Sequence, residues 1–170
     1  KNITNADGRT LYMISDDAKA MKFEIMRTDS TNFSQGGTSG IEITRPPMPL
    51  SDEAGHPNHS SIVTYSANTG KTANIKDAYE EGDFDFTGAK TFDQNSGYRT
   101  TSVLSVPLKN HENDIVGVIQ LINATDKKSG KVVAFSDDIQ QQVESLASQG
   151  AVALTNKRLV KELKTLFESF

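Results

Sequence analysis

The fold of this chain is decided by three consecutive segments: FDQNSGYRT at residues 92–100, SVLSVPLKN at residues 102–110 and IVGVIQLIN at residues 115–123. The first segment is polar and contains a glycine, so it predicts a loop. The other two are apolar and rich in β-branched residues, which predicts strands. No catalytic triad or metal-binding motif has this form.

The two strands are expected to pair through a hairpin turn at residues 111–114. Residues 115–123 are nearly all apolar, which is typical of a strand buried on both faces. Side chains alternate in the strand before the turn. One face is expected to carry Val103, Ser105 and Pro107, and the other Leu104, Val106 and Leu108.

The N-terminal part predicts a second antiparallel hairpin. Its first strand covers residues 9–15, with Leu11 and Met13 on one face. In its second strand, over residues 21–27, alternation places three apolar side chains on one face: Met21, Phe23 and Ile25.

A long connection rich in Gly and Pro follows from Thr28 to Ser61, and within it only Ile41–Thr44 has the pattern of a strand. So long a connection in a compact domain is either a disordered linker or a functional lid. The apolar Met48 and Leu50 favour a loop that packs over the domain.

Two helices are predicted, and between them a brief strand at residues 72–75 and a further helical turn that starts at residues 77–79. Residues 60–70 form a short helix that Gly70 closes, and Ser136 caps a long helix that begins near Asp137. The first apolar stripe of the long helix comprises Ile139, Val143, Leu146 and Leu154. A coiled-coil seam with 4-3-4 spacing follows, formed by Leu159, Leu163, Leu166 and Phe170. Together the elements predict an α+β fold with a central, mainly antiparallel sheet, helices packed on it and a long C-terminal helix.

Composition restricts the classes of function. A chain of 170 residues with 35% hydrophobic residues suits one globular domain, and its net charge of −4 argues against a nucleic-acid partner. The chain has no Cys, which excludes disulfides, thiolate metal sites and a Cys nucleophile. This is typical of a reducing compartment, and we expect a cytoplasmic domain. No apolar run approaches the ~20 residues that span a bilayer, so we expect no membrane insertion.

Two parts of the chain resemble a known family. The segment NTGKTANIKDAY at residues 68–79, together with residues 92–123, is similar to the GAF domains of cyclic-nucleotide phosphodiesterases and adenylate cyclases. Residues 36–40 and 46–50 look more like GAF modules of bacterial proteins with HD-GYP, GGDEF or histidine-kinase outputs. The resemblance covers residues 5–159 and implies a GAF-like fold whose first helix is mostly missing.

The resemblance also implies a binding site. In cyclic-nucleotide-binding members, the ligand lies between the sheet and a lid of helix and loop. Carried over by local motif, the ligand-binding residues are Thr10, Tyr79, Asp93, Ser96, Arg99 and Thr100. Hydroxyls and a carboxylate can bond phosphate or base, and an aromatic ring can stack. Each residue also has a structural explanation, such as a tethered Tyr hydroxyl or an Arg–acid pair.

One family motif differs here. Cyclic-nucleotide-binding members carry Asn-Lys and then Phe, three residues and Asp-Glu, which implies a Lys–Asp salt bridge. Here Ala124 follows Asn123, and the acids after Phe135 are displaced. The bridge cannot form as written unless Lys127 or Lys128 substitutes, which argues against cyclic AMP or cyclic GMP as the ligand.

Catalysis and metal binding have little support in the sequence. His56 and His59 share a loop with two acids, but no third metal ligand is evident. Asp83 and Asp85 could share one face of an extended loop, and a polar lid edge explains them. GAF relatives that reduce free methionine sulfoxide or attach bilin use Cys, which this chain lacks. We therefore assign no catalytic and no metal residues.

Three functions stay open. The first is a regulatory domain of a bacterial signalling protein that binds a small molecule, with no cofactor assigned beyond a possible cyclic nucleotide. It would act through a homodimeric C-terminal helix on an output domain in the same chain. The second is a ligand-free dimerisation module, and the third is a small hydrolase, for which no nucleophile–base pair is evident. We expect a truncated piece of a longer protein, with the sensor domain over residues 1–159 and a coiled-coil or linker helix starting over residues 160–170.

Overall fold

The computed structural model describes residues 4–153 and 164–169. Its strands are β1 (Ala6–Ile14), β2 (Ala20–Thr28), β3 (Phe33–Gly36), β4 (Met48–Pro49), β5 (Ala73–Ile75), β6 (Val103–Lys109), β7 (Ile115–Thr125) and β8 (Val132–Val133). Its helices are α1 (Ile62–Thr69), α2 (Thr87–Ser96) and α3 (Asp137–Ala153). The strands form one sheet in the order β3-β2-β1-β7-β6-β5, with β4 paired to β2 and β8 to β7. The pairings are antiparallel, which confirms the predicted α+β class.

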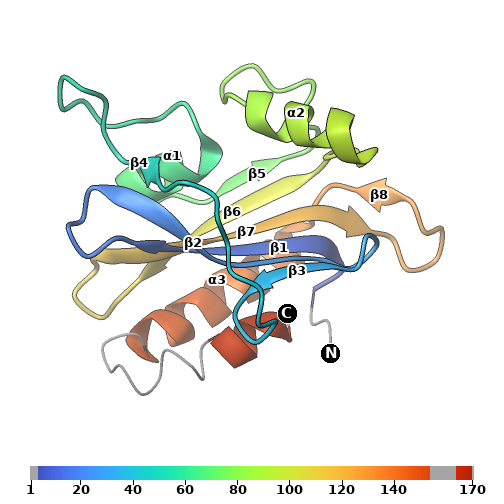
Figure 1. Ribbon diagram of the computed structural model, residues 1–170. Helices are drawn as coiled ribbons and strands as arrows, with labels where there is room; N and C mark the ends of the chain where they lie inside the picture. The colour runs from blue at the N-terminus through green and yellow to red at the C-terminus, as the bar shows by residue number, and fades with distance from the viewer. Residues whose placement is uncertain (1–3, 154–163, 170) are drawn as a thin grey trace.

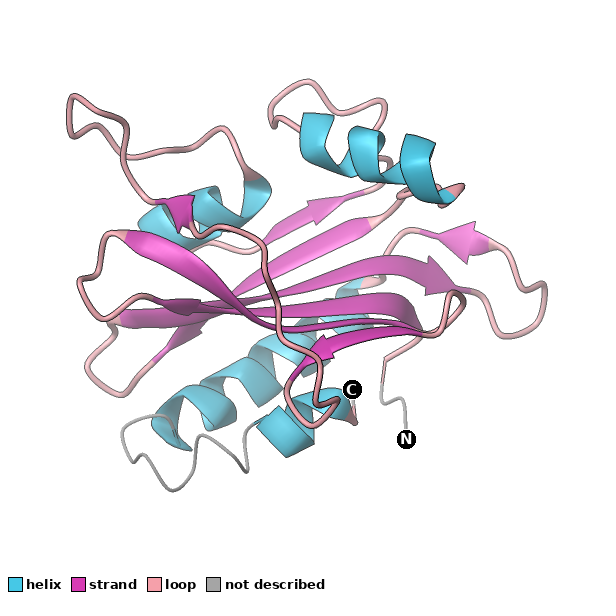
Figure 2. Cartoon of the chain, in the orientation of Figure 1, coloured by secondary structure: helices cyan, strands magenta, loops and turns pink. Residues whose placement is uncertain are grey.

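The sheet divides the molecule into two layers of side chains. Helix α3 covers one face, while α1, α2 and the loop that precedes α1 lie over the other (Figures 1 and 2). The buried core on the α3 side includes Leu11, Ile25, Leu104, Val106, Leu108, Leu121 and Val143. The core on the α1 side includes Tyr12, Met21, Val63, Ile75, Val103 and Val118.

The β6–β7 hairpin follows the predicted alternation. The three leucine and valine side chains at positions 104, 106 and 108 face α3. Ser105 faces α1, where its hydroxyl donates to the Ser66 hydroxyl at 2.8 Å, and both side chains are fully buried. This buried pair ties α1 to the sheet, and it needs no partner from solvent because each hydroxyl is bonded.

The prediction that Met21, Phe23 and Ile25 share one face of β2 is wrong. Ile25 opposes Leu11 and Phe23 opposes Tyr12, so Glu24 is an extra residue in the ladder between β1 and β2. Such a β-bulge changes the face on which the following residues lie. Met21 and Phe23 therefore pack on the α1 side, whereas Ile25 is in the core on the α3 side.

The long connection before α1 contains β3 and β4 rather than the predicted strand. Ile41–Thr44 has no strand structure, and the Ile41 side chain is 54% exposed. Gly36 and Gly37 have positive φ values of 70° and 55°, which turn the chain away from the sheet edge immediately after β3. Met48 and Leu50 pack against the core on the α1 side, as the sequence predicts.

The predicted short helix is confirmed with its caps. Ser61 accepts hydrogen bonds from the backbone N–H groups of Val63 at 3.2 Å and Thr64 at 3.5 Å. At the other end Gly70, with a φ of 69°, donates its N–H to the carbonyl of Ser66 at 2.9 Å. Ser136 likewise accepts from the N–H of Ile139 at 3.2 Å where α3 begins.

The loop predicted over residues 92–100 is wrong in its first half, because residues 92–96 end helix α2. This helix has no apolar stripe, and Asp93 is its one buried residue. Gly97, with a φ of 77°, closes it by donating its N–H to the carbonyl of Asp93 at 2.8 Å. Polar contacts of Asp93, described below, hold the helix together with the packing of Ala89 against the core on the α1 side.

The predicted coiled-coil seam falls largely outside the described residues, which is true of Leu159, Leu163 and Phe170 and also of Leu154. Leu166 is 39% exposed, whereas its neighbour Phe167 is 1% exposed in the core on the α3 side. Lys164 Nζ lies 3.1 Å from a carboxylate oxygen of Glu24. Residues 164–169 thus pack along the β2–β3 side of the sheet (Figure 1). No helix in the described part of the chain is long and apolar enough to cross a membrane.

Candidate functional site

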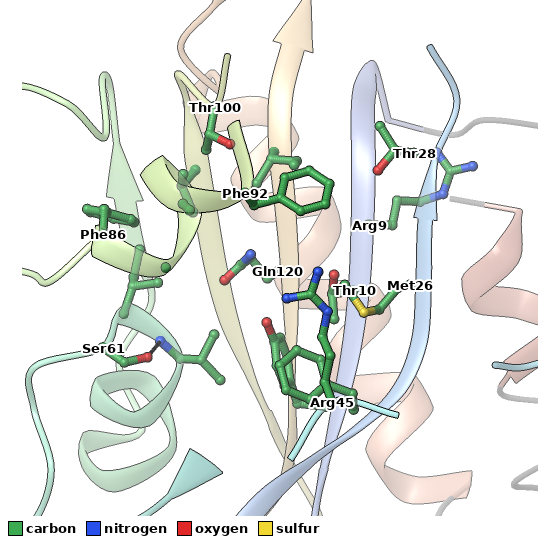
Figure 3. Close-up of a pocket in the computed structure, with 18 of the residues that line it drawn as sticks. Arg9, Thr10, Met26, Thr28, Arg45, Ser61, Phe86, Phe92, Thr100 and Gln120 are labelled. Carbon is green, nitrogen blue, oxygen red and sulfur yellow. Dashed lines mark hydrogen bonds between the residues drawn. The ribbon is translucent and has the colours of Figure 1, made fainter. Parts of the chain in front are cut away.

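A pocket of about 380 Å³ lies between the sheet and its α1–α2 layer. Strands β1, β2 and β7 form its floor, and residues of α1, α2 and the loop before β4 form its walls (Figure 3). The volume is in the range of small-molecule sites. The lining residues of floor and walls are largely apolar or aromatic, including Tyr12, Phe23, Met26, Phe86, Phe92 and Ile122.

The floor carries two polar side chains that lie next to each other. Thr10 and Gln120 are direct partners across the β1–β7 ladder, and both line the pocket. Thr10 is 8% exposed, and neither side chain makes a hydrogen bond within residues 4–153 and 164–169. A sheltered hydroxyl and amide with free bonding capacity can orient a polar ligand.

Arg9 forms the polar corner of the pocket beside β2. Its guanidinium makes a bidentate pair with Asp29, with both N–O distances at 3.2 Å. Its Nε is buried and has no hydrogen-bond partner within the described part of the chain. Because both terminal nitrogens of its guanidinium bond to Asp29, Arg9 contributes mainly to the lining of the pocket.

Arg45 lies at the rim, on the loop that precedes β4. Its guanidinium carbon is 5.9 Å from the ring centroid of Phe23 on β2 and 5.6 Å from that of Phe92 on α2. Both distances are within the range of cation–π contacts. Arg45 therefore connects the loop with the two aromatic walls above the floor (Figure 3).

Tyr12 closes the end of the pocket near Phe23, whose ring centroid lies 4.8 Å away. Burial raises the pKa of the Tyr12 hydroxyl, while the nearby charge of Arg45 opposes that rise. The hydroxyl is therefore neutral across the physiological range, and this part of the wall carries no negative charge.

Of the six predicted site residues, Thr10 and Thr100 line the pocket and the other four do not. Asp93 is 4% exposed and accepts from the Thr100 N–H at 2.8 Å, the Thr100 hydroxyl at 3.0 Å and the Tyr79 hydroxyl at 2.8 Å. We call Tyr79, Asp93 and Thr100 the Asp93 cluster. It fixes α2 to the segment before the helix and to the segment between the helix and β6.

Arg99 and Ser96 complete the outside of this wall. The Arg99 guanidinium lies 3.6 Å from the Tyr79 ring centroid and pairs with Asp77 at 3.0 Å. Ser96 donates to the carbonyl of Phe92 at 2.7 Å, a bond within its own helix. The hydrogen bond to Asp93 is the main cause that raises the pKa of Tyr79.

Asn123, the Asn of the family motif, anchors the segment after α2. Its amide oxygen accepts from the Thr101 N–H at 2.7 Å, and its amide nitrogen donates to the Arg99 carbonyl at 2.8 Å and the Tyr98 hydroxyl at 3.0 Å. Ala124, at the family's Lys position, is 1% exposed in the apolar core. Neither Lys127 nor Lys128 is within 4.0 Å of a carboxylate among the described residues, so neither supplies the bridge here.

Sequence reasoning missed most of the lining residues, among them Gln120, Arg45 and Phe23. Gln120 had a signal, because it is the one uncharged polar residue inside the apolar run of β7 before Asn123. Arg45 and Phe23 had none, because a long loop brings them together. His56 pairs with Asp52 at 3.2 Å, but no group of three metal-binding side chains occurs in the described part of the chain.

Comparison with known proteins agrees with this architecture. The model of the GAF domain family matches residues 2–154. The chain is 32% identical over 113 residues to the dual 3',5'-cyclic-AMP and -GMP phosphodiesterase 11A of Takifugu rubripes. The aligned region covers 66% of this chain and 12% of that protein. This chain is also 39% identical over 131 residues to the dual 3',5'-cyclic-AMP and -GMP phosphodiesterase 11 of Drosophila melanogaster. Here the aligned region covers 77% of this chain and 8% of that protein.

Solved structures share the fold at low sequence identity. The GAF domain from a phosphoenolpyruvate-protein phosphotransferase of Coxiella burnetii superposes with a TM-score of 0.61 at 11% identity, over 90% of this chain and 74% of that one. The type II free methionine-R-sulfoxide reductase of Thermoplasma acidophilum gives 0.53 at 16% identity, over 94% and 82% of the two chains. These likenesses establish the fold alone. With a family model that covers most of its length, this chain belongs to the GAF domain family.

Proposed function

We propose that this GAF domain is a sensor that binds a small molecule in the pocket above Thr10 and Gln120. The observation that carries the proposal is the pair of polar floor side chains without a partner in the described chain, inside a pocket of about 380 Å³. Both side chains open to the pocket and keep their full bonding capacity within the described chain, so a ligand with polar atoms can bond to both.

The six predicted site residues take two roles in this proposal. Thr10 and Thr100 contact the ligand, because both line the pocket. Tyr79, Asp93, Ser96 and Arg99 hold the α2 wall in position and act on affinity through it. None is assigned a catalytic role.

Cyclic nucleotides are the first candidates to test. The two relatives at 32% and 39% identity are named for cyclic AMP and cyclic GMP. A purine could stack between the aromatic walls while the floor amide bonds its edge. Against this stands Ala124, which replaces the Lys of the family's salt-bridge motif. The ligand class is therefore left to the experiment below.

We further propose that ligand binding regulates an output domain in the same protein through a homodimeric C-terminal helix. The chain covers only 12% and 8% of the two relatives' lengths, which supports a larger protein with other parts. Coupling would require that the ligand bind two states of the helix pair with different affinity. The bacterial signalling context and the cytoplasmic location stay predictions.

Thermal denaturation with a panel of cyclic mononucleotides, cyclic dinucleotides, nucleotides and small metabolites tests the sensor. A ligand at one hundred times its dissociation constant should stabilise the domain by ~2.7 kcal/mol. Gln120→Leu, with about tenfold weaker binding, should reduce this shift by about half, whereas Lys131→Gln, at an exposed position outside the pocket, should leave it unchanged. No shift with any compound, together with a dimer that persists on dilution, would instead support the ligand-free dimerisation module.

A further inference from the structure

The charges that line the pocket are unequal in number and in their pairing. Three arginines are among the lining residues, Arg9, Arg27 and Arg45, against one acidic residue, Asp85. Asp29 pairs with both of the first two, at 3.2 Å from Arg9 and 3.6 Å from Arg27. Arg45 is the lining cation that has no carboxylate within 4.0 Å among residues 4–153 and 164–169.

The one lining carboxylate is already satisfied at the other side of the pocket. Asp85 accepts from the backbone N–H of Thr87 at 2.9 Å and from the Thr87 hydroxyl. These bonds begin helix α2, and they lower the pKa of Asp85, with the hydroxyl bond as the main cause. Asp85 therefore serves the start of the helix, and it leaves the charge of Arg45 uncompensated.

The contacts of Arg45 leave its donors free. Phe23 and Phe92 attract the guanidinium through their ring faces, and no hydrogen bond engages its N–H groups within the described part of the chain. A guanidinium has five N–H donors in a fixed planar arrangement that matches a carboxylate or phosphate in two-point contact. Aromatic contacts thus hold Arg45 at the rim while its bonding capacity remains available to a ligand.

The loop that carries Arg45 is fixed on both sides. Before it, Thr38 donates its N–H to the carboxylate of Glu168 at 3.0 Å, and Gly36 donates its N–H to the Ile41 carbonyl at 2.6 Å. After it, two prolines restrict the backbone, and Met48 pairs with Met21 of β2. Such a loop can present Arg45 to the pocket at a lower entropic cost than a free loop.

We infer that the ligand of this pocket carries an anionic group, and that Arg45 is the residue that selects for it. This inference rests on the proposed sensor function and adds the ligand's charge. The neutral Thr10 and Gln120 at the floor orient the uncharged part of the ligand, while its phosphate or carboxylate lies at the rim against the guanidinium. A neutral analogue of the same shape loses this contact.

The test compares ligands that differ by one charged group. Isothermal titration calorimetry on the whole chain would measure the dissociation constants of cyclic AMP against adenosine and of cyclic GMP against guanosine. The charged member of at least one pair should bind roughly tenfold tighter, the size expected for a partly exposed hydrogen bond between charged groups. The difference should shrink at high salt, because Arg45 lies at the exposed rim.

Two substitutions locate the effect. Arg45→Gln should weaken the charged ligand roughly tenfold and leave the neutral one unchanged, whereas Arg45→Lys should restore part of the difference. Arg27→Gln is the matched control, because Arg27 lines the same pocket but already pairs with Asp29. It should change either dissociation constant less than about twofold.

The outcomes separate this inference from the sensor proposal. Equal affinity for charged and neutral members, or equal losses for both in Arg45→Gln, would overturn the anion assignment and leave the sensor intact. Binding of none of the four probes, together with no shift for any compound of the thermal denaturation panel, would overturn both. If Arg27→Gln changed the dissociation constants as much as Arg45→Gln, the assignment of Arg45 would also be overturned. Selection for a charged ligand would then reflect the charge of the whole pocket rather than Arg45.

Discussion

The Asp93 cluster and the pocket floor are both sheltered polar groups on the α1–α2 side of the sheet, yet their bonding is opposite. In the cluster, Asp93 accepts three hydrogen bonds, from Tyr79 and twice from Thr100. On the floor, Thr10 and Gln120 make none within the described part of the chain. The first arrangement stabilises the fold, and the second leaves capacity for a ligand. In this domain, the bonded side chains of Tyr79 and Asp93 are therefore evidence for support, and the unbonded side chains of Thr10 and Gln120 are evidence for binding.

The strongest way to break this comparison is Asp93→Ala. The substitution leaves the N–H and hydroxyl of Thr100 without their acceptor in a buried position and frees helix α2. We expect a loss of ~3 kcal/mol in the free energy of unfolding, measured by urea denaturation. Ser96→Ala, in the same helix but exposed, should cost less than ~0.5 kcal/mol. A cost for Asp93→Ala below ~1 kcal/mol would mean that the cluster does not hold α2.

Gln120→Leu tests the opposite side of the comparison. Because the amide has no partner to lose in the described chain, the free energy of unfolding should change by less than ~0.5 kcal/mol or rise slightly. Ligand binding should weaken by ~1.5 kcal/mol, about tenfold, in titration calorimetry with whichever compound the panel identifies. Thr10→Val should act in the same direction. A large loss of stability in either variant would show that the floor is structural.

Tyr79→Phe sharpens the comparison within the cluster. It removes one of the three donors to Asp93 and keeps the ring against which Arg99 stacks. We expect a loss of stability clearly smaller than that of Asp93→Ala, and no direct loss of ligand contact, since Tyr79 does not line the pocket. Denaturation and calorimetry on the same sample would check both. Binding that falls while stability is unchanged would move Tyr79 into the site.

Tyr12→Phe should have the smallest effect at neutral pH, and its effect should depend on pH. Burial raises the pKa of Tyr12 in the folded domain above the ordinary value of 10.0, so the unfolded chain releases this proton first. The stability that this difference provides is complete below pH 10 and is lost as the pH rises beyond it. Denaturation midpoints of the wild type should therefore fall more steeply above pH 10 than those of Tyr12→Phe. Parallel curves would contradict the buried hydroxyl.

The parts of the fold that sequence reasoning predicted are those fixed by local periodicity or caps. Strands β6 and β7 alternate as expected, and Ser61 and Gly70 bound α1 as expected. Helix α2 was missed because it has no apolar periodicity, and the contacts of Asp93 that hold it come from residues distant in sequence or beyond the helix. The prediction of a strand at Ile41–Thr44 is wrong, because no strand among the described residues pairs with this segment.

The candidate site was predictable only in part, for a related reason. Thr10 was placed correctly on the floor because the family motif and the strand pattern agree. Arg45 was missed because a loop of variable course brings it to the pocket, and nothing near it in sequence indicates Phe23 or Phe92 as its partners. The burial of Phe167 in the core was not predicted, because the heptad spacing placed its neighbour Leu166 in the apolar seam instead.

The extra residue at Glu24 has a consequence for how this chain aligns with its relatives. Phe23 and Ile25 oppose adjacent residues of β1. Removing Glu24 would therefore leave a regular strand in which all the remaining side chains keep their faces. An alignment guided by structure should therefore open a one-residue gap at position 24 when the relative has a plain ladder. Glu24 also makes an ion pair, since its carboxylate lies 3.1 Å from Lys164 Nζ. A strand can thus gain a new attachment point for the end of the chain without moving any side chain that lines the pocket.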